Sequence, residues 1–165
     1  MAQDQFYTTF DVVRIIGIKM ERLHDWLKRG YIQPTHQEET GRGMKNYFDL
    51  VQLYVIQAFK YLVENGITRE VASEWTMDIH KSVELDRQAA NIRPDQSGAN
   101  LQYLKALPKF IVVYKGRSPF GETDQLVVIK DNESKIGLNT FMTADALHII
   151  NFSNIVKQVN ARLEA

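Results

Sequence analysis

Basic side chains are concentrated in two short stretches near the start of the chain. Between Arg14 and Arg29, five basic residues stand against two acidic ones. A second pair, Arg42 and Lys45, lies in a polar segment with two glycines. Ammonium and guanidinium groups bind phosphate oxygens, so both stretches could contact a nucleic-acid backbone. Basic residues are equally ordinary on a solvated surface. The helices and strands that carry them must therefore show whether these residues belong to a nucleic-acid-binding site.

Two short helices are predicted around the first stretch. Thr8 or Thr9 can cap the first helix, and Gly17 is suited to end it because glycine adopts the left-handed conformation at little cost. The second helix runs from about Lys19 to Arg29 and has one apolar face, made of Met20, Leu23, Trp26 and Leu27. Two short helices joined by a tight glycine turn are typical of a helix-turn-helix, and also of an ordinary helical hairpin.

The segment from Gln33 to Asn46 favours the first of these readings. It contains Pro34 and is flanked by Ile32 and Tyr47, which can anchor a two-stranded ribbon. Such a ribbon, or wing, would lay its basic side chains along a phosphate backbone.

An ordered series of short motifs follows the same order as in a known family. The motifs are Tyr7-Thr8, Asp11-Val12-Val13, Gly17-Ile18, Leu23 with Trp26, Gly30-Tyr31-Ile32 with Pro34, Gly43 to Tyr47, Asn65-Gly66-Ile67 and Val71-Ala72. Over Tyr7 to about Trp75, the chain resembles the DNA-binding domain of the MerR family of transcription regulators. Related winged domains of phage small terminase subunits and excisionases share much of the pattern.

Four positions depart from the family pattern. His24 stands where the family commonly has arginine, and Asp25 where it has an aromatic residue. In the wing, Met44 replaces an aromatic residue and Lys45 replaces arginine. An aspartate repels phosphate, and lysine lacks the bidentate fork of arginine.

The resemblance implies a homodimeric, sequence-specific DNA-binding transcription regulator whose second helix enters the major groove of duplex DNA. The residues expected to bind DNA are Arg14, Lys19, Arg22, His24, Arg42, Lys45 and Tyr47. Tyr47 is also a candidate core anchor for the wing. The alternative is a winged protein-interaction adaptor, which the zero net charge and the acidic residues Asp25, Glu38 and Glu39 favour. A phage DNA-packaging or recombination accessory protein lies between the two, since it binds DNA without regulating transcription.

Composition limits the other functions. The 165 residues include 20 basic and 20 acidic side chains, so the net charge is zero and non-specific DNA affinity should be weak. There is no cysteine, which excludes disulfides and thiolate metal sites, and the four histidines lack metal-ligand spacing. We find no catalytic motif, and we expect no enzyme activity, cofactor or metal. Without a membrane-length apolar run or a signal-peptide pattern, a cytoplasmic protein is expected.

Beyond the wing, a strongly apolar helix is predicted from Tyr47 to Asn65, capped by Asp49 and buried on most sides. Thr68 should cap a further helix with an apolar stripe, whose pattern fades by about Ala90. Residues 1–90 are therefore assigned to the winged helix-turn-helix domain. Residues 91–108 are assigned to a linker, with a short helical turn at 101–107.

The last third changes to β-branched runs. Strands are predicted at Phe110–Tyr114 and Leu126–Ile129, with a loop between them at Gly116–Thr123. A further strand is predicted at 136–142, and residues 146–150 are either a fourth strand, which we favour, or the start of a helix. Ser153 should cap a terminal amphipathic helix that covers the sheet. The expected class is α+β, with residues 109–165 forming a small antiparallel sheet with a C-terminal helix. Its role would be oligomerisation or the binding of a small-molecule or protein effector.

Overall fold

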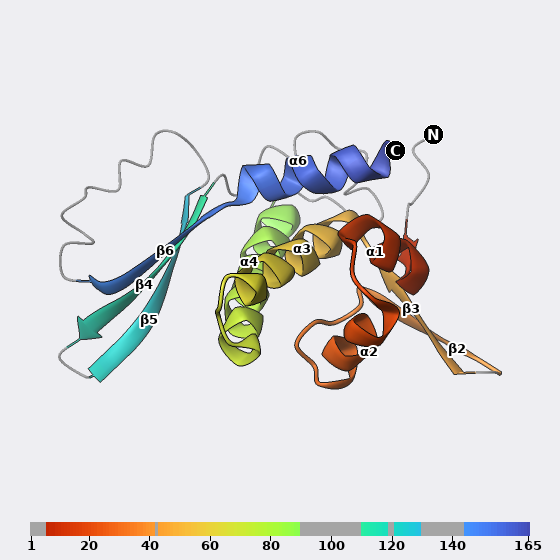
Figure 1. Ribbon diagram of the computed structural model, residues 1–165, viewed down its shortest axis with the longest axis horizontal. Helices are drawn as coiled ribbons and strands as arrows, with labels where there is room; N and C mark the ends of the chain where they lie inside the picture. The colour runs from red at the N-terminus through yellow and green to blue at the C-terminus, as the bar shows by residue number, and fades with distance from the viewer. Residues whose placement is uncertain (1–5, 42, 90–109, 119–120, 130–143) are drawn as a thin grey trace. The chain divides into compact units, whose positions relative to one another are not determined.

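The computed structural model describes residues 6–41, 43–89, 110–118, 121–129 and 144–165, and of residues 110–118, 121–129 and 144–148 it describes the backbone alone. The chain divides into two compact units, one made of residues 1–105 with 155–165 and the other of residues 106–154. The fold is α+β, as the sequence predicts (Figure 1).

The first unit begins with the predicted pair of helices. Helix α1 spans Thr9–Ile16 and helix α2 spans Met20–Lys28. Thr8 caps α1 and Gly17 ends it with a φ of 68°, so both local signals act as predicted. Lys19 occupies the N-cap position of α2 without a side-chain hydrogen bond.

The predicted ribbon is present, and a short third strand joins it. Strand β2 spans His36–Thr40 and β3 spans Gly43–Phe48, in an antiparallel pair. Strand β1, Tyr7–Thr8, pairs with the other edge of β3, and the sequence does not predict this pairing. This pairing ties the base of the wing to the start of α1.

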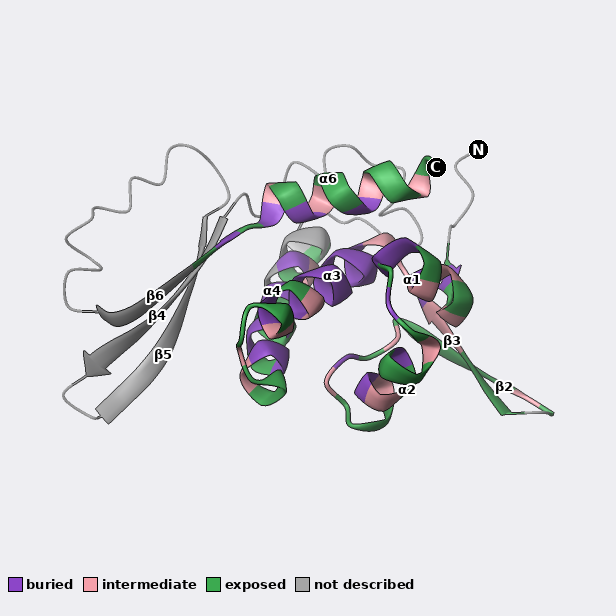
Figure 2. Ribbon diagram, viewed as in Figure 1, coloured by how far each residue is buried: buried purple, intermediate pink, exposed green. Residues whose placement is uncertain are grey.

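Two longer helices complete the middle of the first unit. Helix α3 spans Leu50–Glu64, and the Asp49 side chain accepts a hydrogen bond from the Gln52 N–H at its start. Helix α4 spans Arg69–Ala89 and begins after Thr68, as predicted. Figure 2 shows α3 buried along almost its whole length, which agrees with its apolar sequence.

The second unit contains a three-stranded antiparallel sheet in the order β5-β4-β6. Its strands are β4 at Phe110–Ser118, β5 at Gly121–Ile129 and β6 at Ala144–Asn151. The prediction of a loop at Gly116–Thr123 is wrong, because the pairing of β4 with β5 continues to Ser118 and Gly121. The linker at 91–108, the helical turn at 101–107 and the strand at 136–142 lie outside the described residues.

Helix α6, Phe152–Leu163, differs from its prediction in two ways. Its first turn is capped by Asn151, whose side chain accepts from the Asn154 N–H at 3.0 Å, and not by Ser153. Residues 155–165 also pack within the first unit, while the sequence analysis placed them on the sheet. The physical reason is that α3 offers Tyr54 and Gln57 as hydrogen-bonding partners for Asn160 and Gln158.

Candidate nucleic-acid interface

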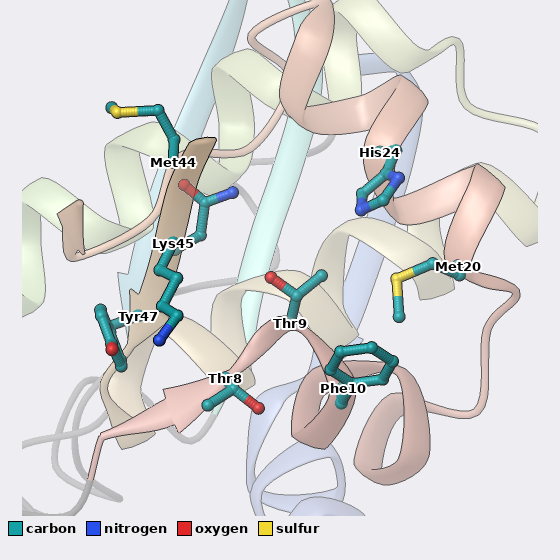
Figure 3. A pocket seen from close by; sticks show the side chains of 9 residues that line it. Thr8, Thr9, Phe10, Met20, His24, Met44, Lys45 and Tyr47 are labelled. Atoms are coloured by element: carbon teal, nitrogen blue, oxygen red, sulfur yellow. The ribbon is translucent and has the colours of Figure 1, made fainter. Parts of the chain in front are cut away.

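A groove of about 360 Å³ lies between α2 and the wing. Figure 3 shows Met20 and His24 of α2 on one side, Met44, Lys45 and Tyr47 of β3 on the other, and the start of α1 between them. The remaining lining residues are Thr8, Thr9, Phe10 and Asn46. The structure therefore brings together three of the predicted residues, His24, Lys45 and Tyr47, from two elements.

The β1–β3 pairing fixes this geometry. Thr8 faces Tyr47 across the two strands, so the wing cannot rotate away from the start of α1 without breaking the ladder. Thr8 also accepts a hydrogen bond from the Asp11 N–H, and Asp11 accepts one from the Thr8 N–H at 2.9 Å. This reciprocal cap sets where α1 begins.

Tyr47 is built into the wing. Its ring stacks on His36, its cross-strand neighbour, with 6.0 Å between ring centres. Its hydroxyl donates to the Glu38 carboxylate at 3.0 Å, and this hydrogen bond raises the pKa of Tyr47. Glu38 also lies opposite Lys45 in the ribbon. The half-buried Tyr47 thus braces the ribbon, which agrees with the anchor role considered for it.

Arg22 lies on a different flank of α2 from His24. Its guanidinium group is 5.4 Å from the centre of the Trp26 ring, and one nitrogen is 3.9 Å from a Glu64 carboxylate oxygen on α3. With 42% of its side chain exposed, Arg22 remains accessible from solvent. It does not line the groove that His24 shares with the wing.

The other predicted residues are distributed around these elements. Lys19 is exposed at the turn before α2. Arg14 is exposed on α1 and lies 3.8 Å from Asp11. Arg42 lies outside the described residues.

Lys28 is a basic residue of α2 that the candidate set left out. Residues four apart share one face of a helix, so exposed Lys28 lies on the same side as His24. Phe10 and Met44 were also missed, and they are 76% and 54% exposed at the groove. Their exposure comes from the tertiary arrangement, and nothing in the local sequence signals it.

Among the described residues, no group of three or more acidic or histidine side chains is arranged to hold a metal ion. No helix in the described ranges has the length and apolar character needed to cross a membrane.

The family model described as MerR HTH family regulatory protein matches residues 7–76. The match covers α1, α2, the wing, α3 and the first part of α4. A comparison with curated proteins finds no match.

Proposed function

Since residues 7–76 are a helix-turn-helix domain of the MerR family of DNA-binding transcription regulators, we propose that this protein recognises a specific duplex sequence through α2 and the wing. One observation carries the proposal: His24 of α2 and Lys45 of β3 line the same groove. A helix in the major groove would then bring the wing against the neighbouring backbone.

The roles follow from the side chains. His24 and Lys28 share the exposed face of α2 and would approach base edges. Lys45 is exposed on the wing and would bind phosphate, which positions the protein without reading the sequence. Arg22 and Lys19 flank this face and would reach the backbone on either side.

We further propose a cytoplasmic homodimer that binds two half-sites. Because the whole chain has a net charge of zero, one copy has little non-specific attraction to DNA, so a second copy would supply the contacts that specific binding needs. The sheet unit would then join subunits or bind an effector.

The test measures binding of the purified protein to the duplex upstream of its own gene and to an unrelated duplex, at about 50 and 200 mM salt. We expect preferential binding to the first duplex that persists at the higher salt. Equal loss on both duplexes would leave only non-specific charge contacts, and absence of binding at both salts would contradict the proposal.

Lys45→Ala tests the wing. Loss of one phosphate contact should weaken binding to both duplexes and reduce the slope of log affinity against log salt by about one. The matched control is Lys81→Ala, which removes the same charge from α4, where Lys81 lies 3.4 Å from Asp78. An equal effect of both substitutions would show that only net charge matters.

A winged adaptor that binds a protein partner is the second candidate. The observation that favours it is Glu38, which lies opposite Lys45 and accepts the Tyr47 hydrogen bond, so the wing carries negative charge beside its lysine. If the protein binds no duplex, capture of partners by the full-length chain becomes the next experiment, with Lys45→Glu as the comparison variant.

A further inference from the structure

Arg162, near the end of α6, reaches the last turn of α1. Its Nη1 atom donates hydrogen bonds to the carbonyl oxygens of Ile15, at 2.9 Å, and Ile16, at 3.1 Å. Carbonyls in the last turn of a helix lack partners within the helix, and the helix dipole favours a positive charge there. Arg162 therefore supplies what this helix end needs, from a residue nearly 150 positions away.

A second cation contacts the same helix end. The Lys60 ammonium group of α3 donates to the Ile16 carbonyl at 3.0 Å and lies 3.4 Å from the Gly17 carbonyl. Lys60 has only 14% of its side chain exposed, so it is held in place by its surroundings. Together, Lys60 and Arg162 form a two-residue clamp on the end of α1.

This end of α1 is the turn of the helix-turn-helix. Gly17 adopts a left-handed conformation there, and a Cβ atom added to it would have Arg162 Nη1 as a neighbour at 4.0 Å. Lys19, the N-cap residue of α2, makes no side-chain capping hydrogen bond. The direction in which α2 leaves the turn thus depends on packing and on the clamp.

Arg162 is held at this position by the rest of α6. Asn160 accepts a hydrogen bond from the Tyr54 hydroxyl at 2.8 Å, and Gln158 accepts one from Gln57 at 3.3 Å. Ile155 and Val159 are 3% and 0% exposed. These contacts run along α3, so α6 is fixed on the first unit over at least one and a half turns.

We infer that Arg162 is a positioning residue for DNA binding, which orients α2 by holding the turn and makes no contact with DNA. The part that concerns DNA rests on the proposed function. Because β6 ends at Asn151 and α6 begins at Phe152, the helix that carries Arg162 directly follows the last strand of the sheet in the chain.

The test compares Arg162→Ala with Lys157→Ala in the full-length chain. Lys157 is exposed on the same helix, so both substitutions remove one positive charge from α6. Arg162→Ala should weaken binding to the preferred duplex roughly tenfold, the lower end of the scale of a lost charged hydrogen bond. The salt slope should stay unchanged, because no phosphate contact is removed. Lys157→Ala should leave affinity and slope unchanged, and Arg162→Lys should restore part of the affinity.

Hydrogen exchange of the DNA-free protein gives an independent readout. The Gly17 and Ile18 amides donate to the Val13 carbonyl, and their exchange should accelerate in Arg162→Ala but not in Lys157→Ala. Unchanged exchange at these amides would overturn the clamp. A salt slope reduced by about one would instead make Arg162 a phosphate contact and overturn the positioning role. If the wild-type protein binds no duplex, the proposed function fails, while the exchange result still decides whether Arg162 holds the turn.

Discussion

The effect of Asp25 on DNA binding depends on the charged groups around it. One carboxylate oxygen accepts a hydrogen bond from Arg29 Nε at 2.7 Å, and the other lies 3.6 Å from an Arg69 nitrogen. A lone aspartate on α2 would repel phosphate. Here two guanidinium groups offset its charge, so its presence does not argue against DNA binding. Exposed pairs of this kind add little to stability, so their main consequence is electrostatic.

Thr8→Ala should destabilise the protein by about 1 kcal/mol at neutral pH, because it removes the side-chain cap of α1. Thr9→Ala is the matched control, since Thr9 is the first residue of α1 and does not hold the cap. Urea denaturation of the two variants and the wild-type protein measures the difference. Equal stability of the two variants would contradict the capping role.

The same variant should also change the pH dependence of stability. Hydrogen bonds from the Thr8 hydroxyl and N–H hold the pKa of Asp11 below its ordinary value. At pH values between the folded and unfolded pKa of Asp11, the unfolded state therefore binds more protons than the folded state. The stabilisation is fully present above the ordinary aspartate pKa of about 3.9 and is lost as the pH falls through the lower folded value. The difference in the free energy of unfolding between wild type and Thr8→Ala should become smaller below about pH 4. A difference independent of pH would contradict this linkage.

At the scale of elements, helix ends with local signals could be predicted from the sequence. Thr8, Gly17 and Asp49 act through hydrogen bonds or backbone angles within three or four residues, and the structure places them as predicted. Strand β1 could not be predicted, because two residues carry no periodicity. It exists only through its pairing with Tyr47 and Phe48, about forty residues away.

The candidate interface was predictable only in part, for the same reason. Residue type and helix period identify the basic side chains of α2 and the wing. They do not reveal that Glu64 and Trp26 draw Arg22 to one flank, or that His24 shares a groove with Lys45. These relations depend on contacts between distant elements.

Trp26 joins α2 to α3, and substitutions there should separate packing from hydrogen bonding. The ring is fully buried and meets Phe59 edge-on, with 4.8 Å between ring centres. Trp26→Ala should cost about 3–5 kcal/mol. Trp26→Phe should cost less, about 1.5 kcal/mol, because an aromatic ring remains and the indole N–H has no hydrogen-bond partner in the described part of the chain. If Trp26→Phe lowered the free energy of unfolding in urea as much as Trp26→Ala does, the indole N–H would have to make a stabilising hydrogen bond.

At the scale of the molecule, α6, like α1 and α4, is a helix that contacts α3, which is apolar around most of its circumference. The sequence predicted burial of α3 on most sides and found an apolar stripe on the terminal helix. Neither pattern predicts that the two apolar surfaces pack together, because the hydrophobic effect is non-directional and does not select one apolar partner over another. The structure joins them across about one hundred residues, through pairs such as Tyr54 with Asn160.

Ending the chain after Asn151 should therefore destabilise the N-terminal unit, although no residue of its helix-turn-helix is removed. The truncation takes away buried Ile155 and Val159 and the Arg162 clamp, and it exposes Tyr54 and the α3 surface beside it. Loss of the two aliphatic side chains alone should cost about 3 kcal/mol, which lowers the melting temperature by several degrees.

The matched control ends after Leu163 and removes only two exposed residues, so it should melt close to the full-length chain. Thermal melting followed through tryptophan fluorescence measures both variants in the same unit, because the two tryptophans of the sequence, Trp26 and Trp75, are both buried in the first unit. If the chain ending at Asn151 melts like the control, α6 contributes nothing to the N-terminal unit. If it melts earlier, the N-terminal unit needs α6 as well as the elements between Tyr7 and Ala89, and a fragment cut after α4 would lack one of the helices of this unit.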